Sequence, residues 1–160
     1  MTPLRQIRTR FNAAFIGSCW SVLALSAFHN ASSQPPLCPG IHVTVLGIRG
    51  TAGTVDCALF DSQRGFPVDV LHFATRVMVM KVPSSEARCD FEGIPPGSYA
   101  LVVLHDENMN GKVDTNWIGI PKEGYGFSKD AKASLSAPSF KDATFLYDGQ
   151  ALEMTVNLHY

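Results

Sequence analysis

The sequence lacks the short signatures by which several enzyme classes are recognised. It contains no GxSxG, HExxH, phosphate-binding P-loop or dinucleotide-binding fingerprint. None of its four cysteines forms a CxxC pair, so a zinc site has little support. These absences exclude the hydrolases and nucleotide-binding enzymes that such motifs define. We expect no catalytic residue and a non-enzymatic role.

Positive charge is scarce after the first eleven residues. The chain has 13 Lys+Arg and 14 Asp+Glu, and Arg5, Arg8 and Arg10 all precede residue 12. Without these three, 13 − 3 = 10 basic residues stand against 14 acidic ones, a net charge of −4. No basic cluster remains to attract a phosphate backbone, which excludes nucleic acid as a partner. The acidic balance instead favours cations or neutral ligands.

No apolar run reaches the roughly twenty residues that a membrane-spanning helix needs. The longest, residues 13–28, follows the three arginines and precedes the polar residues HNASSQPP. This order of basic, apolar and polar segments predicts a signal peptide over residues 1–33 and export to the periplasm or the extracellular space. The alternative is an uncleaved N-terminal anchor, which would be the only contact of the chain with a membrane.

Helical periodicity is also scarce, and only residues 67–74 favour a helical turn. Residues 34–40 are expected to be a linker, and residues 41–160 to form one domain dominated by apolar–polar alternation. The pattern predicts seven strands, over residues 41–46, 54–60, 76–82, 87–91, 98–104, 143–147 and 152–158. Short strands joined by Gly, Pro, Asn and Asp turns predict an all-β fold, an antiparallel Ig-like or transthyretin-like β-sandwich with one long ordered loop.

Two cysteines are in phase with the apolar residues of their strands. Cys57 lies in TVDCALF and Cys89 in ARCDFEG, so both should point into the same core. In an oxidising compartment we expect a Cys57–Cys89 disulfide. Two neighbouring unbonded thiols are the alternative, and Cys38 could replace either partner.

The segment from residue 106 to 114 reads D-x-N-x-N-G-x-x-D. Oxygen-bearing side chains at positions one, three, five and nine, with Gly at six, match most of an EF-hand-type calcium loop. Ca²⁺ prefers six to eight oxygen ligands, and a chain supplies several only by coiling tightly, which Gly111 permits. The predicted calcium ligands are Asp106, Asn108, Asn110, the carbonyl of Lys112, Asp114 and Glu123.

The loop departs from the calcium pattern at position twelve, where Trp117 replaces the usual bidentate Glu. Glu123 is the candidate replacement. With few carboxylates, the expected affinity is weak, with a dissociation constant of about 10⁻⁴ to 10⁻³ M. The alternative is a metal-free loop held by Asx turns, which Asn and Asp favour by themselves.

Aromatic residues follow the loop. Trp117, Tyr125 and Phe127, with His105 before the loop, are candidates for binding an envelope glycan or protein. The alternative is that these rings pin the loop to the sandwich in a structural or assembly module. A third hypothesis is a hydrolase that uses Glu123 and His105.

The stretch GIPPGSYALVVLHDENMNGKVDTNWIGIPKEGYGFS, residues 93–128, resembles the bacterial exported proteins grouped as domain of unknown function 2141. The turn FEGIPPGSY, residues 91–99, is also similar to turns of transthyretin-like, carboxypeptidase-regulatory and collagen-adhesin B-type sandwiches. The resemblance implies a sandwich of that kind and an envelope location, and it implies no substrate. Within the turn, Tyr99 is expected to bury its ring and hydrogen-bond a backbone atom through its hydroxyl.

Overall fold

A computed structural model describes residues 37–118, 121–132 and 136–160. Pro35–Tyr160 forms one compact unit. The predicted signal peptide therefore lies outside the described residues. No helix within the described ranges is long and apolar enough to cross a membrane. All the described secondary structure and both hydrophobic clusters lie in Pro35–Tyr160.

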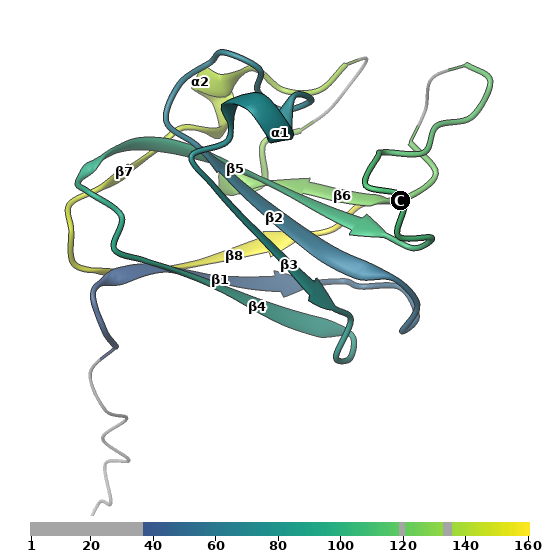
Figure 1. Cartoon of the computed structure of the whole chain (residues 1–160), viewed down its shortest axis with the longest axis horizontal. Helices are drawn as coiled ribbons and strands as arrows, with labels where there is room; N and C mark the ends of the chain where they lie inside the picture. The colour runs from purple at the N-terminus through teal and green to yellow at the C-terminus, as the bar shows by residue number, and fades with distance from the viewer. Residues whose placement is uncertain (1–36, 119–120, 133–135) are drawn as a thin grey trace, which may run out of the picture. The chain divides into compact units, whose positions relative to one another are not determined.

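The domain is mostly β-sheet, as predicted (Figure 1). The described residues form eight strands: β1 (Gly40–Leu46), β2 (Thr54–Phe60), β3 (Arg76–Lys81), β4 (Glu86–Glu92), β5 (Gly97–Asp106), β6 (Gly124–Phe127), β7 (Phe145–Tyr147) and β8 (Ala151–Asn157). Three short helical segments accompany them: α1 (Val70–Phe73), the 3₁₀ turn η1 (Ser128–Asp130) and α2 (Phe140–Ala143).

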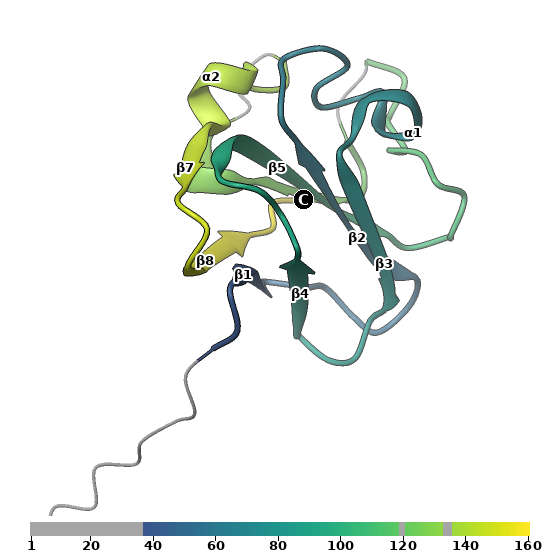
Figure 2. The same ribbon diagram turned by 60° about the vertical axis from the view of Figure 1, so that its left-hand side comes forward.

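The strands form two sheets that face each other (Figures 1 and 2). One has the order β4-β1-β8, and the other β3-β2-β5-β6 with β7 also paired to β5. The predicted antiparallel arrangement is wrong for one pair, because β1 and β8 run parallel, with Ile41 opposite Leu152. A hairpin cannot join parallel strands. β1 and β8 are the first and last strands of the domain, and the apolar–polar alternation of each does not reveal in which direction it runs relative to the other.

The main core lies between the two sheets. Every strand except β6 contributes alternate side chains to it, as the period of two requires. Its fully buried members include Ile41, Val43, Val45, Val55, Leu59, Leu101, Val103 and Val156. Tyr99 confirms the expectation for the turn, since its ring is buried and its hydroxyl donates a 2.8 Å hydrogen bond to the carbonyl oxygen of Pro95.

The Cys57–Cys89 disulfide confirms the predicted pairing. It joins β2 in one sheet to β4 in the other, at the centre of the core. A cross-link over 32 residues removes chain entropy from the unfolded state worth about 3–4 kcal/mol. Cys38 is free and exposed.

Two local predictions need correction. The seven-strand count missed β6, because two of the four residues in GYGF are glycines and give no alternation signal. The predicted strand from 143 begins instead at Phe145, because Ser139 and Asp142 form a reciprocal capping box that starts α2. A second cluster, Ala100, Phe127 and Ala143 with Phe66 and Phe140, covers the opposite face of β5.

Candidate functional site

The predicted calcium segment begins where β5 ends. Asp106 is 1 % exposed, and its two carboxylate oxygens accept hydrogen bonds from the backbone N–H groups of Asn110 at 3.1 Å and Gly111 at 2.6 Å. Gly111 has φ of 71°, a conformation that residues with a Cβ adopt at a steric cost. One buried carboxylate therefore bends the following five residues into a tight loop.

Two asparagines continue this loop through Asx turns. The Oδ1 of Asn108 accepts from the N–H of Asn110 at 3.1 Å, and the Oδ1 of Asn110 accepts from the N–H of Lys112 at 2.8 Å. Both side-chain amides donate to the carboxylate of Asp114, from Asn108 at 2.7 Å and from Asn110 at 3.0 Å. The side chains at positions one, three, five and nine are therefore all engaged inside the loop.

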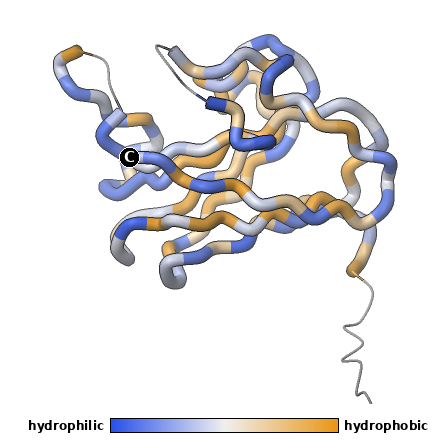
Figure 3. The backbone as a smooth tube through the Cα atoms, turned by 180° about the vertical axis from the view of Figure 1, so that it is seen from behind, coloured by the Kyte–Doolittle hydropathy of each residue, from blue (hydrophilic) through white to orange (hydrophobic). Residues whose placement is uncertain are grey.

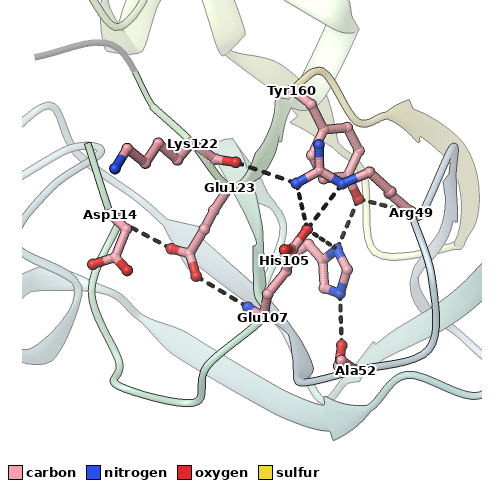
Figure 4. Close-up of polar contacts among 8 residues, drawn as sticks. All are labelled: Arg49, Ala52, His105, Glu107, Asp114, Lys122, Glu123 and Tyr160. Atoms are coloured by element: carbon pink, nitrogen blue, oxygen red, sulfur yellow. Dashed lines mark hydrogen bonds and ion pairs between the residues drawn. The ribbon is translucent and has the colours of Figure 1, made fainter. Parts of the chain in front are cut away.

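Glu123 closes the base of the loop, as Figure 4 shows. The side chain is 4 % exposed, and its two oxygens accept from the N–H groups of Glu107 at 3.0 Å and Asp114 at 2.9 Å. The N–H of Lys122 donates to the carbonyl oxygen of Asp114 at 2.8 Å. The Glu123 carboxylate thus binds the backbone of Glu107, 16 positions earlier in the chain, as well as that of Asp114. We call this arrangement the Glu123 clamp.

His105 is fully buried beside the clamp and bonded on both sides (Figure 4). Its Nε2 lies 2.8 Å from the carbonyl oxygen of Ala52, which can only accept, so Nε2 donates. Its Nδ1 lies 2.7 Å from the hydroxyl of Tyr160, which also accepts from the N–H of Arg49. The Oε1 of Glu107 lies 3.8 Å from the same Nδ1. Burial raises the pKa of the Tyr160 phenol, which therefore keeps its proton.

Arg49 ties this histidine network to the loop. Its guanidinium donates to the Oε1 of Glu107 at 2.8 Å and 3.2 Å and lies 4.3 Å from the centre of the Tyr160 ring. It also donates to the carbonyl oxygen of Lys122 at 3.4 Å. The C-terminal residue, the β1–β2 connection and both ends of the loop are therefore held together.

Asp56 is a third acidic residue near Asp106 and Glu123. Its Oδ1 is buried and has no hydrogen-bond partner within the described residues. Burial raises the pKa of Asp56, and the charges of Asp106 and Glu123 raise it further. Sequence reasoning missed this residue. The available signal was a carboxylate in the middle of an apolar strand, between Val55 and Cys57.

The four predicted ligand-binding residues do not lie on one exposed surface. Trp117 is 94 % exposed, so it does not pin the loop to the sheets. Phe127 is buried in the second cluster, and Tyr125 is half-buried beside it with ring centres 6.0 Å apart. His105 is inside the domain. Of the four, Trp117 alone projects freely.

The six predicted calcium ligands are brought together only in part. Asp106, Asn108, Asn110 and Asp114 converge, whereas Glu123 contacts the loop through backbone N–H groups. In the ranges that the structure describes, no group of three or more His, Cys, Asp or Glu side chains is placed to hold a metal ion. A cation site here therefore depends on amide and carbonyl oxygens as well as on two carboxylates.

Fold and site together define the class: a two-sheet, disulfide-linked β-domain whose one long loop is closed by buried carboxylates. Residues 43–155 match the family model described as an uncharacterized protein conserved in bacteria (DUF2141), and the chain belongs to that family. No curated protein and no solved structure matches the chain. The likeness to transthyretin-like, carboxypeptidase-regulatory and collagen-adhesin sandwiches stays a prediction.

Proposed function

We propose that this protein is an exported, non-enzymatic binding module of the bacterial envelope, whose 106–114 loop is ordered by Ca²⁺ and presents a binding surface. The observation that carries the proposal is the convergence of Asp106, Asn108, Asn110 and Asp114 around Gly111. This is the order of oxygen-bearing side chains that calcium loops of the EF-hand type use.

The donor set fits a hard cation. Each side-chain oxygen of Asp106, Asn108 and Asn110 accepts at most one hydrogen bond here, and an oxygen of this kind has two lone pairs. A cation would bind at the second lone pairs and replace the amide N–H groups that now donate to the Asp114 carboxylate. Two carboxylates support only weak binding, with a dissociation constant of about 10⁻⁴ to 10⁻³ M.

Two features support export. The Cys57–Cys89 disulfide belongs to an oxidising compartment, and such bonds are rare in the cytosol. The basic, apolar and polar order of residues 1–33 is that of a secretory leader.

The hydrogen bonds of His105 and Glu123 support a non-enzymatic role. Both ring nitrogens of His105 and both oxygens of Glu123 are bonded to protein atoms. A hydrolase would need one of these groups free to reach a substrate or a water molecule. In this arrangement the two residues instead hold the loop in place.

A metal-free structural or assembly module is the second candidate. The observation that favours it is that the side chains of the loop already satisfy one another: Asp114 receives two amide N–H bonds, and Asp106 receives two backbone N–H bonds. The two candidates differ in whether added calcium changes the stability of the protein.

Thermal unfolding with and without Ca²⁺ tests the proposal. At about 10 mM Ca²⁺, a hundred times the tighter expected dissociation constant, mass action adds about 2.7 kcal/mol to the free energy of unfolding. Asp114→Asn should remove this gain while keeping the side-chain shape, and Asp148→Asn, in the β7–β8 turn, should retain it. A calcium-independent unfolding midpoint in the native chain would leave only the metal-free module.

A further inference from the structure

One side of the two-sheet domain is closed and the other is open. Beyond β8, His159 and Tyr125 of β6 exchange two backbone hydrogen bonds of 2.9 Å, which join the two sheets on that side. The edges on the opposite side are β3 and β4, and within the described part of the chain neither has a partner on its outer side. Figures 1 and 2 show these two strands joined by one short turn. Two free strand edges therefore lie on the same side of the domain.

The free side of β3 presents backbone hydrogen-bonding groups. The N–H of Val82 donates to the carbonyl oxygen of Gly53 at 3.4 Å, so alternate residues of β3 before it bond to β2. The residues between these, Val77, Val79 and Lys81, therefore point their N–H and C=O groups away from the sheet. Val77 and Val79 are 46 % and 61 % exposed. The middle of this edge is thus apolar and unpaired, which is the condition for adding another strand.

The free side of β4 presents such groups as well. The N–H of Leu158 donates to the carbonyl oxygen of Leu46 at 2.9 Å, so even-numbered residues of β1 bond to β8 and odd-numbered ones to β4. The even-numbered residues of β4, among them Glu86, Arg88 and Asp90, therefore point their N–H and C=O groups outward. Their side chains lie on the solvent face of the sheet, in the alternation of hydrophobic and hydrophilic residues that Figure 3 shows along the strands.

The two free edges carry opposite charge. β3 reads RVMVMK, with two basic residues and no acidic one, a net charge of +2. β4 reads EARCDFE, with one basic and three acidic residues, 1 − 3 = −2. Arg88 and Asp90 form an ion pair at 3.0 Å, whereas Lys81 and Glu86 are exposed and form none within the described ranges. Like charges oppose the pairing of either strand with its own copy, and opposite charges favour the pairing of β3 with β4.

We propose that two copies of this chain form a closed dimer, in which β3 of each copy pairs antiparallel with β4 of the other. The two strands run in opposite directions and are joined only by residues 82–85 (Figure 2). A two-fold axis parallel to the strands therefore forms both pairs at once, and each sheet of one copy continues into a sheet of the other. This self-association goes beyond the proposed function and involves no residue of the 106–114 loop.

The turn between the strands sets the register of the dimer. β3 ends at Lys81 and β4 begins at Glu86, at the same level of the domain. The two-fold axis then places Lys81 opposite Glu86 of the second copy, and Val79 opposite Arg88 of the second copy. All four residues point backbone groups outward, so each opposing pair exchanges two hydrogen bonds. The apolar stem of Arg88 covers the exposed Val79, next to Asp56 on β2.

Sedimentation velocity of the purified chain measures the self-association. The protein is studied in EDTA, so that the result does not depend on calcium, and at concentrations up to about 1 mM, because small interfaces bind weakly. The proposal predicts a concentration-dependent equilibrium between monomer and dimer. A monomer at every concentration overturns the proposal, and so do open-ended oligomers, which a closed two-fold contact does not produce.

Exchange of charges between the strands identifies the contact. Lys81→Glu and Glu86→Lys should each weaken the dimer by about tenfold or more, because each change affects two symmetric pairs. An equal mixture of the two variants should restore the native affinity, since each variant supplies the charge that the other lacks. An ion pair across the turn of a single chain cannot give this result. If the mixture stays as monomeric as the separate variants, the proposal is wrong.

A proline on the free edge tests the backbone contact. Val79→Pro removes an N–H group that points outward, so it should abolish the dimer and change the urea unfolding of the monomer little. Lys141→Glu, at an exposed position of α2, is the control for charge reversal and should dimerise like the native chain. A dimer that persists in the Val79→Pro chain overturns the proposal. If that chain does not fold, the mixture of the two charge variants decides.

Discussion

At the scale of single residues, the loop depends on carboxylates turned inward. The spacing of Asp106, Asn108, Asn110 and Asp114 could be read from the sequence, and the structure brings these four together. The clamping role of Glu123 could not be read from the sequence, because its two partners are backbone N–H groups that only the tertiary fold brings near. The exposure of Trp117 was also unreadable, since composition does not show which side of a loop faces solvent.

The clamp yields a first prediction. Glu123→Gln places an N–H donor opposite one backbone N–H group and leaves a buried donor unpaired, which should reduce the free energy of unfolding by about 1–3 kcal/mol. Urea unfolding measures the loss, and amide exchange at Glu107 and Asp114 should accelerate. Glu92→Gln, on an exposed position of β4, is the control and should change neither quantity. Unchanged exchange at both amides would remove the clamp from this account.

Asp56 gives a second prediction through its raised pKa. A carboxyl group whose pKa is higher in the folded than in the unfolded protein destabilises the fold once the pH exceeds its unfolded-state pKa. This loss of stability grows as the pH rises through the folded-state pKa. Asp56→Asn removes this charge beside Asp106 and Glu123, so it should raise the unfolding midpoint at pH 7. The gain should vanish in acid, where Asp56 is protonated in both states. A gain that is equal at both pH values would contradict the electrostatic explanation.

At the scale of elements, alternation located most strands but not their partners. The last strand, β8, shows a clear apolar–polar period, yet nothing in that period indicates that it runs parallel to β1. The glycines of β6 conceal a strand that is identified only by its pairing with β5. Local sequence patterns determine which face of a strand is buried. Long-range pairing determines which strands are neighbours and whether they run parallel.

A cross-strand pair between β1 and β4 gives a third prediction. His42 lies opposite Asp90, with Nδ1 2.6 Å from the carboxylate, and its Nε2 lies 2.8 Å from the carbonyl oxygen of Cys38. Both partners accept, so the doubly protonated ring satisfies both. The hydrogen bond to Cys38 and then the one to Asp90 raise the pKa of His42. Burial pushes the pKa of Asp90 upward, but its bonds from His42 and Arg88 outweigh this and lower it.

The signs define a pH window. The His42 contribution is complete below its ordinary pKa of 6.5 and is lost as the pH rises through the folded value. The Asp90 contribution is complete above 3.8 and is lost as the pH falls through the folded value. The stability difference between the native chain and His42→Gln should therefore peak between these values. His72→Gln is the control, because its 2.6 Å contact with Asp69 is exposed and screened. Equal pH profiles for the two variants would contradict the account.

At the scale of the whole molecule, one covalent bond joins the two sheets, and it was predictable because Cys57 and Cys89 share the phase of the core residues. Replacing both with Ser should lower the free energy of unfolding by about 3–4 kcal/mol or more, since the core also loses apolar contacts. Urea unfolding measures this loss. Cys38→Ser should have little effect, because Cys38 is exposed and unbonded. If a reducing agent leaves the stability of the native chain unchanged, the disulfide is not a stabilising link.

The two sheets of Pro35–Tyr160 thus support one clamped loop, and we propose that this loop holds a calcium ion. The most direct measurement is a crystal structure of the protein grown with millimolar Ca²⁺. The account predicts an ion with Asp106, Asn108, Asn110 and Asp114 oxygens at about 2.3–2.6 Å. If the amides of Asn108 and Asn110 still donate to Asp114 under that condition and no ion lies among them, the claim is contradicted.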